Sequence, residues 1–296
     1  MPTTALRRIQ RPGKRSNLSA APDPTTPATS GTTYKVTGVR VLRSEWAKFW
    51  SLRSSWITLG VAVFLLILFG AVASYTYSPD AVDTSGPPGP GNGGDSDAIS
   101  LALTGVTFAS LAIGVLGVLL SAGEYTTGMI RSTLAAVPRR LPVLWSKAAV
   151  IGPIALFLTA LGALAAFLLG TPGLDGEKIA LSLSDDGVLR SLAGAGGYLA
   201  LVAVFGVALG MLLRSSAGAI AALVGVLLIL PGLASLLPDS WYDTVSPYFP
   251  SNAGSAVYAL HQSSDALSPG AGIAVFAGWV ALTLVGAAVR LVRTDV

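Results

Sequence analysis

The feature that most constrains this chain is a series of six apolar runs, each long enough to cross a lipid bilayer as a helix. The runs cover residues 56–75, 101–123, 141–170, 192–213, 217–237 and 271–291. A membrane-spanning helix needs about 20 consecutive, mostly apolar residues. Only 11% of the 296 residues are charged, against about 25% in soluble domains. The sequence therefore predicts an all-α membrane protein with six transmembrane helices.

The charged residues are distributed unevenly over the connections between these runs. The N-terminal region, the connection after the second run with the nearby Lys147, Arg214 and the C-terminal end from Arg290 onward hold 17 of the 19 Lys and Arg residues and 4 of the 15 acidic residues. The connections at 76–100, 171–191 and 238–270 hold 2 basic residues against 11 acidic ones. Because cytoplasmic connections carry an excess of Lys and Arg, we expect both termini to be cytoplasmic. Orientation then accounts for the net charge of +4, and no nucleic-acid partner is predicted.

Several kinds of chemistry lack the residues that they need. The chain has no Cys and a single His, His261, which argues against a thiolate nucleophile, a zinc site and Ser-His catalysis. No ionisable residue lies near the middle of any apolar run, where ion-driven carriers place such groups. We therefore expect a protein that is not an enzyme and holds no metal, and whose driving force comes from elsewhere.

The residues before the first run fall into two parts. Residues 1–37 are rich in Pro, Ser, Thr and basic residues, which predicts a disordered cytoplasmic tail. Its basic cluster either binds anionic lipid head groups or is simply solvated. Residues 38–55, GVRVLRSEWAKFWSLRSS, instead predict an amphipathic helix.

The apolar residues of this helix fall on one stripe, namely Val39, Leu42, Trp46, Phe49 and Trp50. The basic and hydroxyl residues fall largely elsewhere, namely Arg40, Arg43, Ser44, Lys48 and Ser51. A basic, Trp-bearing amphipathic helix next to a span is expected to lie in the plane of the interface and to contact membrane lipids. The alternative is that it begins the first span, against which the polar residues Arg53, Ser54 and Ser55 argue.

The connection after the second run, GEYTTGMIRSTLAAVPRR at 123–140, predicts a further short helix. Ile130, Leu134 and Val137 share one face of it, with Met129 beside them and Arg131 on another side. The residues alone leave two roles open for such a helix, which lies either on the lipid surface or against a soluble partner.

The ends of this short helix also carry signals. Thr126 or Thr127 would cap its start, and Pro138 would limit its end.

Three segments together resemble a bacterial type-2 ATP-binding cassette (ABC) transporter permease. They are SEWAKFWSLRSSW before the first run, SAGEYTTGMIRSTLAAVPRR after the second and PYFPSNAGSAV before the sixth. The resemblance covers about residues 38–296 and rests on the order of these segments together with the six-span topology.

The resemblance implies a role for each segment. Residues 38–55 resemble the in-plane connecting helix, with the residues Arg40, Arg43, Trp46, Lys48, Phe49 and Trp50. The piece around 127–137 resembles the coupling helix that fits a cleft in a nucleotide-binding subunit, and Glu124 matches the acidic residue that starts that motif. Residues 245–262 resemble re-entrant external helices. The residues implied in coupling are Glu124, Thr127, Met129, Ile130, Arg131, Leu134 and Val137.

The resemblance also implies partners and a place in the cell. These are an ATP-binding cassette subunit, a second permease copy or a paralogue, and the bacterial plasma membrane. The chain has no GxxxxGK[ST] phosphate loop, so ATP would be bound by the partner and no cofactor by this chain. Hydrolysis there would move the docking helix and expose the pathway alternately, which results in export. Glu124 is expected to pair with Arg131 or Lys147, unless it is a simple interfacial carboxylate.

The predicted organisation is therefore a tail at 1–37, an in-plane helix at 38–55 and a six-span permease domain at 56–296. Two other functions stay open at this stage. One is an ATP-independent secondary carrier, which the absence of ionisable residues from the middle of the spans disfavours. The other is a non-transporting scaffold or sensor subunit that uses the same docking helix.

Overall fold

The computed structural model describes residues 37–78, 97–137, 140–262 and 266–293. These residues form helices and no strand. Six segments are long and apolar enough to cross a membrane: Arg53–Tyr75, Ala98–Thr126, Leu141–Leu174, Val188–Leu213, Ser216–Ala234 and Pro269–Arg293. The prediction of an all-helical chain with six candidate membrane spans is confirmed. The tail predicted at 1–37 lies outside the described residues except for Thr37.

The first two helices are separate elements. Helix α1 runs over Gly38–Ser51 and α2 over Arg53–Tyr75. Between them Leu52 has extended backbone angles, φ −85° and ψ 102°, which ends one helix and starts the next. The first span therefore begins three residues earlier than predicted, and Arg53, Ser54 and Ser55 form its first turn instead of the end of the in-plane helix predicted at 38–55.

The second span is interrupted near its start. Its first piece is α3 (Ala98–Ala102), and α4 (Val106–Thr126) follows after a three-residue break. Asp97 caps α3, because its carboxylate accepts from the Ser100 backbone N–H at 2.6 Å while its own N–H donates to the Ser100 hydroxyl. Gly105 lies within the break, where a side chain would collide with the backbone of Leu65 and Leu66 in α2. Close packing against α2 thus explains why this position is a glycine.

The remaining helices follow in order along the chain. They are α5 (Met129–Ala136), α6 (Leu141–Gly170) with the 3-10 turn η1 (Thr171–Leu174), α7 (Val188–Leu213), α8 (Ser216–Val224), the π turn η2 (Gly225–Ile229), α9 (Leu230–Ala234), α10 (Asp239–Val245), η3 (Ser246–Tyr248), α11 (Pro250–Tyr258) and α12 (Pro269–Arg293). Pro231 has no N–H to donate to the preceding turn. The π turn η2 lies directly before α9, the helix in which this donor is missing.

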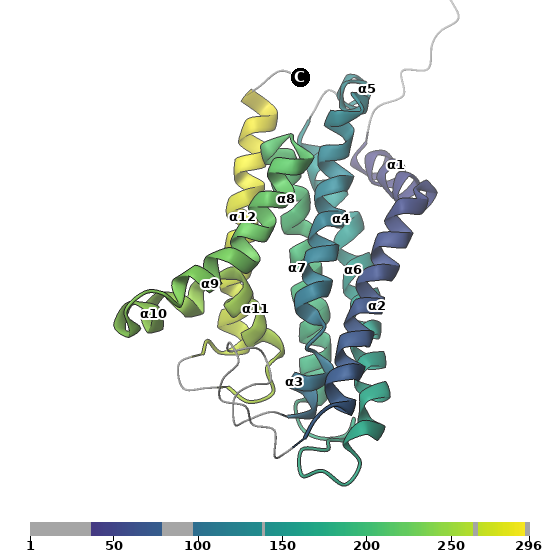
Figure 1. Ribbon diagram of the computed structural model, residues 1–296. Coiled ribbons are helices and arrows are strands. Elements are labelled where there is room, and N and C mark those ends of the chain that lie inside the picture. Colours follow the sequence, from purple (N-terminus) through teal and green to yellow (C-terminus); the bar gives the residue numbers. More distant parts are fainter. Residues whose placement is uncertain (1–36, 79–96, 138–139, 263–265, 294–296) are drawn as a thin grey trace, which may run out of the picture. The chain divides into compact units, whose positions relative to one another are not determined.

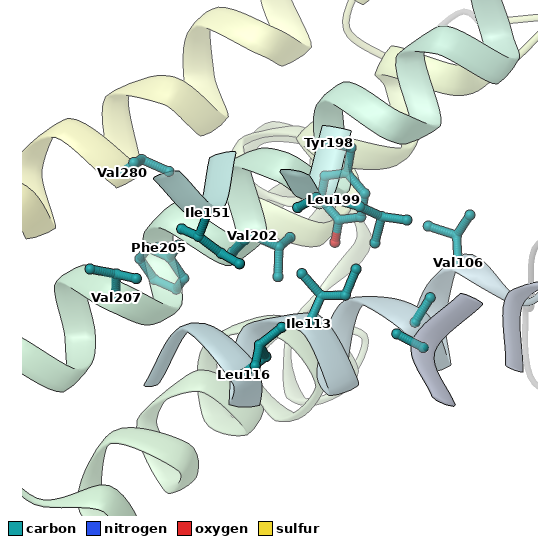
Figure 2. Close-up of a cluster of buried hydrophobic side chains, with 14 of the residues drawn as sticks. Val106, Ile113, Leu116, Ile151, Tyr198, Leu199, Val202, Phe205, Val207 and Val280 are labelled. Atoms are coloured by element: carbon teal, nitrogen blue, oxygen red, sulfur yellow. The ribbon is translucent and has the colours of Figure 1, made fainter. Parts of the chain in front are cut away.

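Helix α7 is the centre of the packing. It contacts α4, α6, α8, α11 and α12, and it carries buried side chains around most of its circumference. Figure 2 shows Leu199, Val202 and Phe205 of α7 among side chains of α4, α6 and α12. A helix that is apolar all round is typical of the interior of a membrane bundle.

The tightest contact in this core is between α4 and α7, where glycines let the two backbones meet. A Cβ atom on Gly206 would fall on the carbonyl oxygen of Gly114, far inside van der Waals distance. On the same helix, Gly197 has open space around it. Small residues at such crossings allow close helix packing in membranes.

We expect Gly206→Ala to lower the melting temperature of the detergent-solubilised protein, because α4 and α7 must move apart to admit the methyl group. Forced overpacking costs about 1–3 kcal/mol. Gly197→Ala is the matched control on the same helix and should melt like the wild type. Equal melting temperatures for the two variants would contradict this close packing.

The connections between the helices gather at two ends of the bundle. Helices α1 and α5, the α7–α8 connection and the last turn of α12 lie at one end, which we call the α5 end (Figure 1). Hydrogen bonds from two arginine side chains to backbone carbonyls tie this end together: the Arg140 guanidinium donates to the Leu291 carbonyl at 3.1 Å, and the Arg214 guanidinium donates to the Arg290 carbonyl at 3.3 Å. The basic connections that the sequence predicts to share one side of the membrane therefore lie together at the α5 end, as far as the structure describes them.

Candidate functional site

Four charged side chains from three helices meet at the α5 end, and we call them the ion-pair cluster. Glu45 and Lys48 come from α1, Glu124 from α4 and Lys147 from α6. Glu45, Glu124 and Lys147 are each no more than 6% exposed, whereas the Lys48 side chain is 31% exposed. Two carboxylates and two ammonium groups give the cluster a net charge of zero. Charges buried in this way are tolerated only when they are paired.

The local sequence explains how the side chains reach one another. Val41, Glu45 and Phe49 are spaced four residues apart, so they lie on one side of α1 and are buried there. Lys48 is one turn after Glu45. Glu124 is in the last turn of α4, and Lys147 is in the second turn of α6, so both face the space beneath α1.

The hydrogen bonds of the cluster use every ammonium donor. Lys147 Nζ donates to Glu124 Oε1 at 2.7 Å, to Glu45 Oε2 at 2.8 Å and to the Leu120 carbonyl at 3.1 Å. Lys48 Nζ donates to Glu45 Oε1 at 2.8 Å and to Glu124 Oε1 at 3.0 Å, and it reaches Thr133 Oγ1 of α5 at 3.5 Å. An ammonium group has three donors, so neither lysine has a donor left.

One acceptor of the cluster is left over. The Oε2 atom of Glu124 is buried and has no hydrogen-bond partner among the described residues. The other three carboxylate oxygens each accept at least one bond from a lysine. Buried polar atoms of this kind are uncommon in folded proteins and call for an explanation.

Both α1 members of the cluster have pKa values shifted toward their charged forms. Burial alone would raise the pKa of Glu45, but the ammonium groups of Lys147 and Lys48 outweigh it and lower that pKa. Burial alone would lower the pKa of Lys48, but the carboxylates of Glu45 and Glu124 raise it. The cluster therefore keeps both charges on α1 at neutral pH.

These shifts predict how the cluster contributes to stability at different pH. A carboxyl group whose pKa is lowered by folding stabilises the folded state at pH values above its ordinary pKa, which is 4.5 for Glu45. That stabilisation is lost as the pH falls through the pKa of the folded state. An amine whose pKa is raised by folding stabilises the folded state at pH values below its ordinary pKa, as is the case for Lys48. That stabilisation is lost as the pH rises through the pKa of the folded state. Glu45 and Lys48 therefore contribute their full stabilisation at pH values between their two ordinary pKa values.

We expect Glu45→Gln to melt below the wild type by a constant margin near neutral pH. That margin should shrink as pH falls below 4.5, because the wild type then also loses its carboxylate. Thermal unfolding in one detergent across a pH series measures the margin. A margin that persists unchanged well into acid would contradict the pairing.

A cavity of about 460 Å³ adjoins the ion-pair cluster. It is lined by residues of α1, the start of α2, the last turns of α4, and α6. Its walls are mostly apolar, and Glu45, Lys48, Glu124 and Lys147 form its charged end.

The short helix expected within 123–140 is present as α5, but it begins differently from the prediction. Gly128, in the left-handed region with φ +72°, occupies the N-cap position, and no side chain caps the helix. Thr126 and Thr127 were expected as caps, yet both hydroxyls donate backward to the Gly123 carbonyl at 2.9 Å. They bond to the last turn of α4 because that carbonyl has no partner at a helix end. Pro138 lies outside the described residues.

The apolar face of α5 is turned toward the bundle. Ile130 is only 1% exposed, Val137 is buried, and Leu134 is half-buried against the core. Met129, Arg131 and Thr127 are exposed. The residues proposed from sequence for coupling therefore separate into an inner set that fixes α5 and an outer set that is accessible, while Glu124 lies in the ion-pair cluster.

The predicted partners of Glu124 are half correct. Lys147 does pair with it, but Arg131 is exposed and its guanidinium is not among the ion-pair partners of Glu124 in the described structure. Lys48, expected on a polar face of α1, is the second cation. Sequence reasoning missed Glu45. The signal that could have found it is an acid within an otherwise apolar i, i+4 series, next to Lys48.

Helix α1 has a second apolar side that faces outward. Val39, Leu42, Trp46 and Trp50 are exposed, as are Arg40 and Arg43. The Trp46 and Trp50 rings stack with centroids 5.8 Å apart, and Trp50 contacts Trp56 of α2 edge-on. The prediction that Phe49 shares this outward stripe is wrong. Phe49 lies at the edge of the stripe, one turn after Glu45, and turns inward with it.

Comparison with known proteins adds no family to this description. Neither a protein-family model nor a curated protein matches the chain. Among the described residues, no group of three or more His, Cys, Asp or Glu is placed to hold a metal ion.

Proposed function

We propose that this chain is the membrane subunit of an ABC exporter and that α5 docks on a separate ATP-binding subunit. One observation carries the proposal. A short helix that extends from the end of α4 is fixed to the bundle by its apolar face, while Glu124, one turn before it, is ion-paired with α1 and α6. This is the arrangement that a coupling element needs in order to pass motion from a partner into membrane helices.

The coupling step follows from these contacts. Ile130 and Val137 hold α5 against the bundle, so a push on its outer side moves the end of α4 with it. The Lys147–Glu124 and Lys48–Glu124 pairs would then carry the displacement to α6 and α1. Packed elements that shift together in this way are a common basis of switching between two states. ATP is bound and hydrolysed by the partner, and no cofactor is bound by this chain.

Charge and exposure support the orientation and the environment. The basic connections indicate that the α5 end is cytoplasmic, in the plasma membrane of a bacterium, with both termini on that side. The exposed Trp46 and Trp50 beside Arg40 and Arg43 are typical of a helix that lies in the interface and contacts lipid. The orientation of the chain in the membrane explains its excess of basic residues, so no nucleic-acid partner is proposed.

The helices between the fifth and sixth spans suit the re-entrant role. Helix α11 packs against α7 and α12, with Ala253, Ala256 and Val257 buried. Asn252 ties it to η3 by donating to the Ser246 carbonyl at 2.9 Å. The α8–α9 segment and α12 bury less of their apolar surface than α7 does. This leaves apolar area for a second permease copy or a paralogue as well as for lipid.

The experiment that tests the proposal is a pull-down of the detergent-solubilised protein from its own host, with ATPase activity assayed on the copurified proteins. We expect an ATP-binding subunit to copurify and its turnover to depend on this chain. Absence of any ATPase would favour a secondary carrier. An ATPase that binds but turns over independently of this chain would favour a scaffold or sensor subunit.

A further inference from the structure

The cavity beside the ion-pair cluster has the size and the lining of a small-molecule site. Its volume of about 460 Å³ lies within the range of ligand pockets, roughly 300–1,000 Å³. Leu116, Leu120, Val150 and Ile151 make its walls apolar. Leu119, which also lines it, is 44% exposed, so the cavity reaches the surface of the bundle.

The hydrogen-bond donors and acceptors at the charged end of this cavity decide which chemical group can bind there. All three donors of each lysine are already engaged within the cluster. Within the part of the chain that the structure describes, Glu124 Oε2 is the one buried carboxylate oxygen without a partner, and Glu124 is among the residues that line the cavity. The cluster thus offers an acceptor on a carboxylate and no donor. It favours a cationic N–H group and disfavours an anion.

We propose that this cavity binds an amphiphile with a primary-amine head group. A turn of the Glu124 carboxylate brings its buried Oε2 to the cavity, where it accepts from the ammonium, and the apolar chain lies along Leu116, Leu119 and Val150. A charge-assisted hydrogen bond of this type is stronger than one between neutral groups. Because the apolar wall reaches a surface of α4 that is expected to face lipid, such a ligand enters from the membrane. The site does not depend on the presence of an ATP-binding subunit.

The test is native mass spectrometry of the full-length, detergent-solubilised protein with a series of single-chain probes. Dodecylamine carries N–H donors and a positive charge, dodecyltrimethylammonium carries the charge without a donor, and dodecanoate carries a negative charge. We expect one dodecylamine per chain, bound at least about tenfold more tightly than either analogue. Equal binding of dodecyltrimethylammonium would overturn the assignment of Glu124 Oε2 as the acceptor.

Two matched variants locate the bound amine. Leu119→Trp fills the cavity from its exposed wall without touching the ion-pair cluster, and it should abolish the single bound amine. Leu161→Trp makes the same change on an exposed position of α6 that does not line the cavity, and it should bind as the wild type does. Unchanged binding to Leu119→Trp, or loss in both variants, would overturn the proposal.

Discussion

Lys147→Met is expected to destabilise the folded chain more than any other single change of charge. Lys147 is 6% exposed and contacts both carboxylates as well as the Leu120 carbonyl. Without it, Glu45 and Glu124 share the ammonium of Lys48, and the buried cluster carries a net negative charge. Breaking a buried ion pair by removing one partner costs about 3–5 kcal/mol. The melting temperature in a fixed detergent measures the loss.

The controls separate pairing from the mere loss of a lysine. Lys178→Met removes an exposed ammonium from the η1–α7 connection and should leave the melting temperature nearly unchanged, because exposed charges contribute little. Adding Glu45→Gln to Lys147→Met restores neutrality and should recover part of the loss, since contacting residues are not additive. If Lys147→Met melts like Lys178→Met, or if the double variant shows the full sum of the single losses, then the cluster does not hold these helices together.

The six spans could be predicted from sequence because length and hydropathy alone decide whether a helix suits a bilayer. The predicted run at 141–170 coincides with α6, and the fourth run differs from α7 only at its start. The break between α3 and α4 was missed, because nothing local interrupts the apolar run. Its cause is a close approach of Gly105 to α2, which depends on tertiary packing.

The candidate site could be predicted only in part, for the same reason. Glu124 and Lys147 could be matched because both lie at the ends of neighbouring runs that the charge distribution places on the same side. The sequence signals Glu45 as an acid within an apolar series, but its pairing with Lys147 depends on the packing of α1 against α6. On α5, the period of Ile130, Leu134 and Val137 located an apolar face correctly. A period does not say whether a face points to a partner or to the chain's own core, and here it points to the core.

If α5 docks on an ATP-binding subunit as proposed, Ala135→Trp is expected to separate the two proteins. Because Ile130 and Leu134 on the inner face of α5 are packed against the bundle, a partner can touch only the outer side, where Arg131 and Ala135 are exposed. A bulky ring at Ala135 blocks that side while the anchoring residues stay in place. Disrupting the centre of an interface costs about 2 kcal/mol or more, which corresponds to binding weaker by about thirtyfold. The pull-down from the host measures the loss.

The choice of position decides what this experiment can show. Leu134→Asp would place a charge against the core, so it would loosen α5 as well as disturb docking, and a lost partner would have two explanations. Ala180→Trp makes the same change at an exposed position between η1 and α7, on the side predicted to be external, and it should keep the ATPase. An ATPase retained by Ala135→Trp in a normally inserted chain would place the docking surface elsewhere. Helix α5 would then be a lipid-facing connection, and the movement attributed to the ion-pair cluster would need another source.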